Sequence, residues 1–572
     1  MSRMVSMVLR LMGKAGKKVG KRLEELSKDP RRAQEALLEE IVAMSRESEI
    51  GRRFDFAGIT DYESFRERVP ITSYDDYVEM VERCVRGEKN VLTGQEIVHF
   101  NITSGTLGAP KRIPVTERHV KNFSDFTAKH LNYLAISHFG KAWTRGKGFS
   151  LSEGTYEILP TGVSIGSASS LQTARMSGSK STRNVDTMAM MYTSPVEARM
   201  PKETGAYTRY LHARFAMQER NITYSNATFS SYLLEIFRYM ENNYEMLVAD
   251  IETGTVSESV SMPPEVRESV ERQLQPMPER ARELREAAKD GFDNTKVISK
   301  IWPGLRYILC VGGGVFASYT DKIRSRYVSE DVGFIYMGIS SSEGIYSSPI
   351  EVNTESSLLL PDRTFMEFIP VRDGEGDLSL GLRLMDELEV GEQYELVITN
   401  VSGLFRYRMR DVIEVTGFHN RTPLVKFVSR AGFAISMYAE KTSEAALQRT
   451  AEKAAAQFGL DMTDYCVVPY EDDKCGRYIF LFEAQGFERG AVAEDELRDF
   501  VEKTLTEYNP VYHEAVEEGR LLPLKVDFLQ EETFALYRDV MAIKGAASAQ
   551  IKPVHVADNP FRQKFFMGLR ME

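Results

Sequence analysis

Residues Thr103–Lys111 read TSGTLGAPK and are rich in hydroxyl groups and glycine. They follow an apolar stretch, residues 96–100, that predicts a strand, and they precede a helix that we expect from Thr116. Closely spaced hydroxyls and glycines leave backbone N–H groups free to surround an anion, and Lys111 adds a positive charge. The order differs from a Walker A loop, in which the hydroxyl follows the lysine. The stretch therefore predicts a phosphate-binding loop, although a purely structural turn has a similar composition.

Three other stretches carry residues that suit nucleotide binding. Gly312–Gly314 follow an apolar run directly, which favours a close approach of the backbone to a ligand. Glu343 ends a hydroxyl-rich loop and could hold Mg²⁺ beside a nucleotide, or it could start or cap a helix. Asp411 could accept ribose hydroxyls or pair with Arg408 or Arg410. From these residues alone the ion pair is the favoured interpretation of Asp411.

The composition indicates a soluble globular protein with more than one core. At 572 residues we expect a large part and a smaller one. The net charge of −11 argues against nucleic acid as the main partner. Because the four cysteines are scattered and the eight histidines form no metal-binding pattern, we expect a reduced, cytoplasmic protein without disulfides or a protein-held catalytic metal. No apolar run reaches 18 residues, so no membrane-spanning helix is expected.

The two ends of the chain differ in pattern. Residues 1–22 carry seven Lys or Arg and no acidic residue on an amphipathic pattern. This could be a membrane-surface helix or a transit peptide, but a first helix with its basic face in water is the favoured interpretation. After a short polar break at 427–432, helix and strand patterns alternate over Ser443–Phe458, Tyr465–Val468, Tyr478–Glu483, Glu494–Leu505, Leu524–Phe528 and Phe534–Ala542.

Taken together and in this order, the motifs resemble those of the GH3 family of acyl acid–amido synthetases, relatives of the acyl-CoA synthetases and firefly luciferase. The family's hydroxyl-rich loop is similar to Thr103–Lys111. The other matching stretches are Tyr192–Ala198, Asp250–Thr255, Ile301–Pro303, Ile339–Glu343, Tyr407–Asn420 and Gly545–Pro553. Each motif is weak by itself, but the ordered set covers about residues 30–560 and is specific.

The resemblance implies a two-step ligase of the adenylate-forming type. ATP and a small carboxylic acid give an acyl-adenylate and pyrophosphate, and an amine, usually an amino acid, then takes the acyl group. Two alternatives are an enzyme that transfers the acyl group to a thiol such as CoA and a non-catalytic acyl- or nucleotide-binding relative. The implied fold is α/β. Residues 1–428 would form a large adenylation domain with a β-barrel part, and residues 429–572 a smaller mobile lid domain, with a hinge near Ser429.

The resemblance also assigns roles to single residues, with ATP and Mg²⁺ as cofactors. Lys552, which reaches the α-phosphate, and Glu343, at the Mg²⁺ or phosphate end, are the implied catalytic residues. Asp411 would bind the ribose. Lys441 would reach the nucleotide from the mobile domain. With the glycine at 313 included, the cofactor-binding set is Thr103, Ser104, Gly105, Thr106, Lys111, Gly313, Ser341, Ser342, Asp411 and Lys441.

The sequence departs from the family pattern at informative positions. Ile339 replaces the motif tyrosine, so an expected ring is missing or is supplied by Tyr336 or Tyr346. Val554 replaces an arginine after Lys552. These changes suggest a bacterial-type member outside the plant hormone-conjugating enzymes. We expect an aromatic or aliphatic monocarboxylic acid as substrate, and the sequence predicts no oligomeric state.

Overall fold

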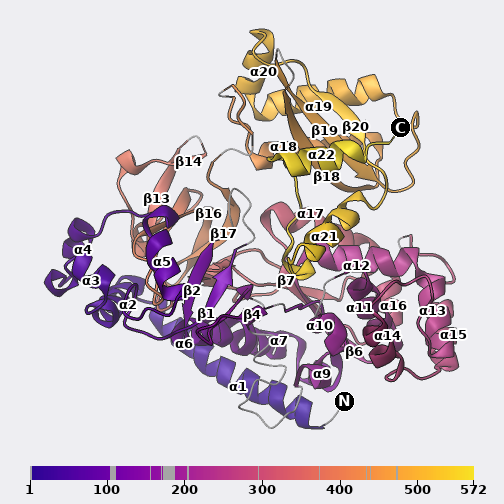
Figure 1. Ribbon diagram of the computed structural model, residues 1–572, viewed down its shortest axis with the longest axis horizontal. Coiled ribbons are helices and arrows are strands. Elements are labelled where there is room, and N and C mark those ends of the chain that lie inside the picture. Colours follow the sequence, from indigo (N-terminus) through magenta and orange to yellow (C-terminus); the bar gives the residue numbers. More distant parts are fainter. Residues whose placement is uncertain are drawn as a thin grey trace. The chain divides into compact units, whose positions relative to one another are not determined.

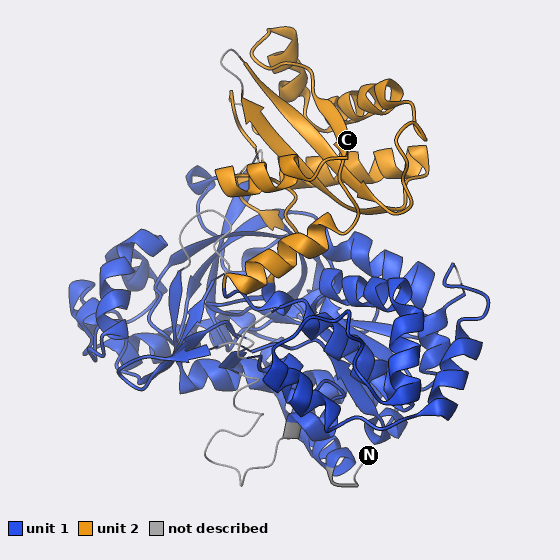
Figure 2. Cartoon of the chain, turned by 45° about the vertical axis from the view of Figure 1, so that its right-hand side comes forward, with its two compact units in different colours: residues 1–372, 376–428, 545–550 blue, residues 373–375, 429–544, 551–572 orange. Residues whose placement is uncertain are grey.

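The structure, a computed structural model, describes residues 3–103, 111–154, 156–168, 170–171, 187–201, 205–293, 295–372, 374–432, 435–438, 440–471 and 475–571. The chain forms two compact units (Figure 2). Unit 1 comprises Met1–Arg372, Gly376–Val428 and Gly545–Gln550, and unit 2 comprises Asp373–Glu375, Ser429–Lys544 and Ile551–Glu572. The predicted mixed α/β architecture, with a large N-terminal and a smaller C-terminal part, is confirmed. Residues 545–550 lie in unit 1, inside the stretch that the sequence analysis placed in the C-terminal domain.

The first sheet of unit 1 brackets the predicted phosphate loop. Its order is β2-β1-β5-β4, with bounds Arg112–Thr116, Ile97–Ile102, Ser164–Gly166 and Tyr156–Ile158. β1 and β2 are antiparallel, and Ile102 lies opposite Arg112, so residues 103–111 connect the two strands. The expected helix follows as α6 (Glu117–Phe123), and Thr116 caps it by accepting the His119 N–H. The π-helical η3 (Ser124–His130) and α7 (Leu131–Phe139) continue from it.

A second sheet of unit 1 is entirely parallel and is buried on both faces. Its order is β3-β6-β7-β8, with bounds Lys147–Ser150, Ile222–Phe229, Tyr307–Val311 and Gly333–Tyr336. On one face Phe149, Ile308 and Phe334 pack into a core with the helices α11–α16, which lie within residues 207–301 and gather beside β6 in Figure 1. On the other face Tyr224 and Tyr307 pack with residues of α1 and α7. Parallel sheets place binding sites beyond the carboxyl ends of their strands, where Gly312–Gly314 follow β7.

The third sheet lies mostly in unit 1, contains antiparallel strand pairs and carries Asp411. Its order is β11-β12-β17-β16-β15-β13-β14, with bounds Ser347–Ser348, Ser357–Leu359, Thr422–Arg430, Tyr407–His419, Gln393–Thr399, Phe365–Arg372 and Glu375–Gly376. The order runs from β11 to β14 without a closing pair in the part of the chain that the structure describes, so the implied β-barrel is not seen there. A two-stranded hairpin, β9 (Ser340–Ser341) with β10 (Gly344–Ile345), carries Glu343 in its turn.

Helix α1 (Arg3–Leu26) is an integral part of unit 1. Val5, Leu9 and Leu23 are buried, and Gly16 lies so close to the Lys129 backbone of η3 that a side chain would clash. The lysines at 14, 17, 18 and 21 are exposed. The favoured interpretation of the basic N-terminus, a first helix with its basic face in water, is confirmed. Among the described residues, no helix has both the length and the apolar character needed to cross a membrane.

The remaining helices of unit 1 complete its cores. They are α2 (Pro30–Ser45), α3 (Glu49–Arg53), α4 (Tyr62–Arg68), α5 (Val78–Val85), α9 (Thr187–Met191), α10 (Val196–Arg199), α11 (Tyr207–Gln218), α12 (Ser230–Asn242), α13 (Tyr244–Thr253), α14 (Pro264–Glu271), α15 (Pro278–Ala287), α16 (Val297–Ile301) and α17 (Ala317–Lys322).

Unit 2 is a three-stranded sheet with helices. The order is β18-β19-β20, with bounds Met462–Glu471, Gly476–Ala484 and Lys525–Phe528. The helices are α18 (Glu444–Phe458), α19 (Glu494–Tyr508), α20 (Pro510–Glu517), α21 (Thr533–Ile543) and α22 (Pro560–Gly568). The predicted alternation of helix and strand is confirmed. Helices α20 and α22, which are short, were not predicted from the sequence pattern.

Candidate functional site

The two ends of the predicted phosphate loop are fixed to each other. Thr103 donates its backbone N–H to the Lys111 carbonyl (3.0 Å), and Lys111 donates its backbone N–H to Thr103 Oγ1 (3.1 Å). The residues between them, including Ser104, Gly105 and Thr106, lie outside the described residues. The side chain of Lys111 donates from Nζ to the Tyr407 hydroxyl (3.1 Å) and lies 5.2 Å from the centre of the Tyr74 ring. The lysine charge is therefore held beside two aromatic rings, at the start of β16.

Glu343 lies in the turn of the β9–β10 hairpin, so the alternative that it starts or caps a helix is wrong. The side chain is nearly fully buried, and Ser341 Oγ donates to its Oε2 (2.7 Å). Two amides attach the hairpin to neighbouring strands: Asn101 on β1 donates to the Ser342 carbonyl and Asn400 after β15 to the Glu343 carbonyl, both at 2.8 Å. The hairpin thus holds a buried carboxylate and a serine hydroxyl in a fixed arrangement.

Tyr346 links this hairpin to Asp411. Its ring is fully buried, and its hydroxyl lies 2.6 Å from Ser341 Oγ. Burial, followed by the negative charge of Glu343 and then that of Asp411, raises the pKa of Tyr346 well above its ordinary value. Both carboxylates therefore lie within electrostatic reach of one phenol. Tyr346 brings a phenol to the hydroxyl-rich loop, one of the two substitutes expected for the tyrosine that Ile339 replaces.

A β-bulge on β16 sets the direction of Asp411. Arg408 pairs with Val397 and Val412 with Glu395, so residues 409–411 lie opposite a single residue of β15. Arg410 within the bulge has φ +66°, a left-handed conformation that a side chain rarely adopts. Bulges and strained residues of this kind are frequent at binding sites. The guanidinium of Arg408 binds the Glu395 carboxylate (2.6 and 2.8 Å). The ribose role of Asp411 stays a prediction.

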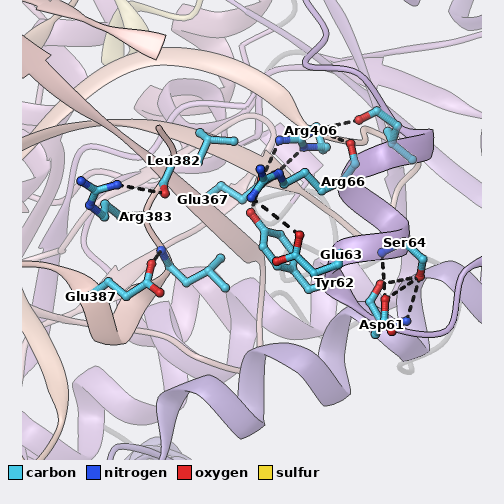
Figure 3. Close-up of polar contacts among 12 residues, drawn as sticks. Asp61, Tyr62, Glu63, Ser64, Arg66, Glu367, Leu382, Arg383, Glu387 and Arg406 are labelled. Carbon is cyan, nitrogen blue, oxygen red and sulfur yellow. Dashed lines mark hydrogen bonds and ion pairs between the residues drawn. The ribbon is translucent and has the colours of Figure 1, made fainter. Parts of the chain in front are cut away.

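A buried ion pair fixes the beginning of β16 (Figure 3). Arg406 has φ +45°, and its guanidinium binds both carboxylate oxygens of Glu367 (2.8 and 2.9 Å). It also donates to the carbonyls of Val69 (2.7 Å) and Arg66 (3.2 Å), while the Tyr62 hydroxyl donates to Glu367 (2.9 Å). A pair satisfied on every side is structural, and it holds the neighbouring Tyr407 in place for Lys111.

The glycines after β7 approach a carboxylate of the chain itself. A Cβ atom on Gly313 would lie 2.7 Å from Glu355 Oε2, and the Gly314 N–H donates to the same oxygen (3.3 Å). Burial raises the pKa of Glu355. Gly313 therefore lies close to Glu355, which no sequence pattern singled out, and the predicted approach of Gly313 to a ligand stays a prediction.

Both predicted lysines of the smaller domain lie in unit 2 and are exposed. Lys441 has φ +51° and follows Glu440, whose carboxylate accepts the Tyr478 hydroxyl (2.6 Å). Lys552 follows Ile551, whose carbonyl accepts from Arg538 (2.8 Å).

A histidine close to Lys552 forms a charged cluster that the sequence analysis missed. His555 is buried between Glu444 Oε1 (3.2 Å) and Asp464 Oδ1 (3.3 Å) and stacks on Tyr465. Burial by itself would lower the pKa of His555, but the hydrogen bonds to Asp464 and Glu444 outweigh it and raise the pKa to about 10. No residue spacing indicated this cluster, because Asp464 and His555 lie far apart in the sequence.

A second missed cluster is fully buried in unit 1. Glu153 accepts the Tyr232 hydroxyl (2.8 Å), and His212 Nε2 lies 3.5 Å from the same oxygen. His212 Nδ1 contacts Ser194 Oγ (2.7 Å), which donates to the Ser150 carbonyl (3.0 Å). Serine, histidine and glutamate recur in nucleophilic triads, but this serine is inaccessible and its proton points at a carbonyl. The cluster is therefore not a hydrolytic site.

Comparison with known proteins gives a consistent result along the chain. Family models match residues 19–332 (GH3 family N-terminal domain), 357–430 (GH3 family central domain) and 444–560 (GH3 family C-terminal domain). An indole-3-acetic acid-amido synthetase, GH3.4 of Arabidopsis thaliana, is 29% identical over 93% of this chain and 90% of its own. A jasmonoyl–L-amino acid synthetase, GH3.5 of Oryza sativa subsp. japonica, is 26% identical over 92% of each.

Solved structures show the same fold at lower identity. AtGH3.15 acyl acid amido synthetase in complex with 2,4-DB has a TM-score of 0.81 at 21% identity, covering 97% of this chain and 96% of that one. A 2-hydroxyisobutyryl-CoA ligase in its postadenylation state has a TM-score of 0.51 at 13% identity, covering 92% and 89%. The curated relatives named here are plant enzymes, so the expectation of a bacterial-type, non-plant member is not supported.

Proposed function

Because this chain belongs to the GH3 family, we propose that it is an ATP-dependent acyl acid–amido synthetase. In the first step a carboxylate oxygen of the acid attacks the α-phosphorus of ATP, the bond to the bridging oxygen breaks, and pyrophosphate leaves. In the second step an amine nitrogen attacks the acyl carbon, the bond to the adenylate oxygen breaks, and AMP leaves with loss of a proton from nitrogen. The product is an amide.

The cluster around Tyr346 is the observation that carries the proposal. The Ser341 hydroxyl contacts both the Glu343 carboxylate and the Tyr346 hydroxyl, and Asp411 on the bulged strand lies within electrostatic reach of the same phenol. Carboxylate oxygens accept hydrogen bonds from hydroxyls and bind cations, so this cluster suits a ligand that brings both. A nucleotide with its metal supplies both.

The roles within unit 1 follow from this chemistry. Ser104, Gly105 and Thr106, with Thr103, would hold phosphate oxygens, and Lys111 would neutralise phosphate charge. Ser341 and Ser342 would lie beside the nucleotide, and Asp411 would accept the ribose hydroxyls.

The residues present fit Mg²⁺ that arrives with ATP. The described residues include no group of three or more histidine, cysteine or acidic side chains able to hold a metal ion by themselves. Magnesium in nucleotide sites is usually held by one or two carboxylates together with the phosphates, and Glu343 would be that carboxylate here. When bound, the ion supplies charge neutralisation at the phosphates.

Unit 2 would complete the site. We assign residues 1–428 to ATP and acyl-acid binding and residues 429–572 to a mobile lid, with the exception of 545–550. Lys552 would stabilise the α-phosphate during adenylation, and Lys441 would contact the nucleotide. An aromatic or aliphatic monocarboxylic acid and an amino acid are the substrate classes that we propose, since the relatives are named for indole-3-acetic acid and jasmonoyl conjugation.

The test is a screen of carboxylic acids for ATP-dependent pyrophosphate release, with and without mixed amino acids. Release that requires one acid and accelerates with an amine supports the proposal and identifies the acid. Formation of a thioester when CoA replaces the amine would favour the thiol-transfer alternative. No release with any acid would favour a non-catalytic relative.

A further inference from the structure

The segment Gly545–Gln550 belongs to unit 1 although the chain on both sides of it belongs to unit 2. Ser548 donates its backbone N–H to Glu153 Oε2 (3.0 Å), and Gln550 donates from Nε2 to Thr228 Oγ1 (3.2 Å). Ala549 is fully buried in the core that covers the parallel sheet. We call Gly545–Gln550 the docked segment. It ends two residues before Lys552.

Neighbouring side chains hold the Glu153 carboxylate in an orientation that lets it bind this segment. The carboxylate is fully buried, and its other oxygen accepts the Tyr232 hydroxyl (2.8 Å). His212, held by Ser194, lies 3.5 Å from the oxygen that Tyr232 occupies. These contacts turn Oε2 toward the Ser548 N–H. The Ser548 N–H is thus bound to a carboxylate that is itself fully buried, and a hydrogen bond is electrostatically stronger in a protein interior than in water.

The chain after Lys552 is fixed to unit 2. The His555 imidazole lies between Glu444 and Asp464, and the His555 carbonyl accepts the Val467 N–H of β18 (2.8 Å). Lys552 therefore lies on a short piece of chain between an anchor in unit 1 and an anchor in unit 2. An extended residue spans at most about 3.6 Å, so the Lys552 Cα stays within about 7 Å of the Gln550 Cα.

From these contacts we propose that Glu153 is a positioning residue for Lys552. By docking Gly545–Gln550 on unit 1, Glu153 keeps Lys552 near unit 1 during adenylation, while the amide-forming step does not require the docked segment. The inference rests on the proposed function, because it takes Lys552 as the lysine of the adenylation step. It adds a group that touches neither substrate nor nucleotide and acts through the backbone of Ser548.

The variant Glu153→Gln tests this. A carboxamide has one acceptor oxygen, whereas Glu153 accepts from both Tyr232 and Ser548; with the glutamine oxygen on Tyr232, its NH2 group faces the Ser548 N–H and leaves that donor unpaired. Leaving a buried hydrogen-bond donor unpaired costs a free energy that corresponds to a change of about tenfold or more in an equilibrium constant. We expect acid-dependent ATP–pyrophosphate exchange to fall by about tenfold, and transfer from pre-formed acyl-adenylate to the amine to change by less than about twofold. Hydrogen exchange of the Ser548 amide should become faster.

Glu241→Gln is the matched control. Glu241 also lies in unit 1, is largely buried and accepts from a tyrosine, Tyr327 (2.6 Å), but it does not contact the docked segment. The Glu241→Gln variant should leave the rates of both half-reactions and the hydrogen-exchange rate of the Ser548 amide unchanged. Thr228→Val is a second variant, which removes only the hydroxyl that Gln550 contacts and keeps the test available if Glu153→Gln fails to fold. It should lower adenylation in the same direction as Glu153→Gln, by a smaller factor.

Equal losses in both half-reactions, or an unchanged Ser548 amide in Glu153→Gln, would overturn the inference. Hydrogen exchange needs no substrate, so it tells a failure of docking from a failure of the proposed function. A wild-type protein without pyrophosphate exchange for any acid would refute the proposed function, and with it the role of Lys552. The exchange rate of Ser548 would still show whether Glu153 docks the segment.

Discussion

Two pairs of carboxylates in this chain act on different buried side chains. In unit 2, Glu444 and Asp464 flank the imidazole of His555, whose raised pKa makes it a cation at neutral pH. In unit 1, Glu343 and Asp411 act on the phenol of Tyr346, which is neutral at that pH. The first pair carries its own compensating charge within the fold.

This difference separates a structural cluster from a binding cluster. A buried cation flanked by two carboxylates has its charge balanced within the fold, and removing the cation should reduce stability rather than activity. A carboxylate held by a hydroxyl group, as Glu343 is by Ser341, keeps the capacity to bind a cation, so its removal should affect activity and leave stability nearly unchanged. The predictions below test this division, starting with the largest expected effect.

The largest effect is expected for His555→Leu. It leaves two partly buried carboxylates without their cation, and breaking such a pair typically costs about 3 kcal/mol of unfolding free energy or more. Amide hydrogen exchange in β18 and β19 reports unit 2. Both tryptophans, Trp143 and Trp302, lie in unit 1, so their fluorescence in denaturant is an internal control. Unchanged exchange in β18 would contradict the structural assignment.

The next effect concerns activity. Glu343→Gln keeps the shape of the side chain and removes the charge proposed to hold Mg²⁺. We expect pyrophosphate release to fall by about 100-fold, which corresponds to about 3 kcal/mol of transition-state stabilisation. The unfolding free energy, measured by Trp fluorescence in denaturant, should stay within about 0.5 kcal/mol of the wild-type value. A large loss of stability with full activity would place Glu343 with the structural cluster instead.

The pH dependence of unit 2 provides a smaller, graded test. Unfolded histidine has a pKa near 6.5, and folded His555 has a pKa of about 10. A pKa raised by folding means that the stabilisation is fully present below about pH 6.5 and is lost as the pH rises toward 10. Exchange in β18, corrected for the intrinsic pH dependence, should show unit 2 becoming less stable across this range. In His555→Leu this loss of unit 2 stability with rising pH should be absent. If it persists in that variant, titratable groups other than His555 cause it.

The two clusters also show how much could be predicted from the sequence. Ser341, Glu343 and Tyr346 are close in sequence, so a motif reveals them, and Asp411 belongs to a motif of its own. His555 meets Glu444 and Asp464 only through the packing of α18 and β18, and Glu153 meets Ser548 across nearly 400 positions. Contacts of that kind depend on the tertiary fold, and no local pattern encodes them.

The fold was predictable for a similar reason. The alternation of unit 2 and the strand before Thr103 follow from periodicity and turn residues, which are local. The docked segment was not predictable, because nothing in its composition distinguishes six residues that pack on unit 1 from the unit 2 residues on either side. The open order of the seven-stranded sheet likewise depends on which edge strands pair, and periodicity does not specify that.

The smallest effect is expected for Tyr346→Phe. It removes the hydroxyl next to Ser341 and keeps the buried ring, so stability should change by no more than about 1 kcal/mol. Ser341 also donates to Glu343, and the loss of its second partner lets its hydroxyl turn. We expect pyrophosphate release to fall by about threefold to tenfold, mostly as a higher KM for ATP.

Tyr336→Phe is the matched control, since Tyr336 was the other expected substitute for the tyrosine that Ile339 replaces. If Tyr336→Phe raises the KM and Tyr346→Phe does not, the phenol that matters lies on β8 rather than beside the hairpin. The residues proposed to bind the nucleotide would then centre on Gly312 and Tyr336 rather than on Tyr346. These two residues are close together, because a Cβ on Gly312 would lie 2.7 Å from the Tyr336 ring.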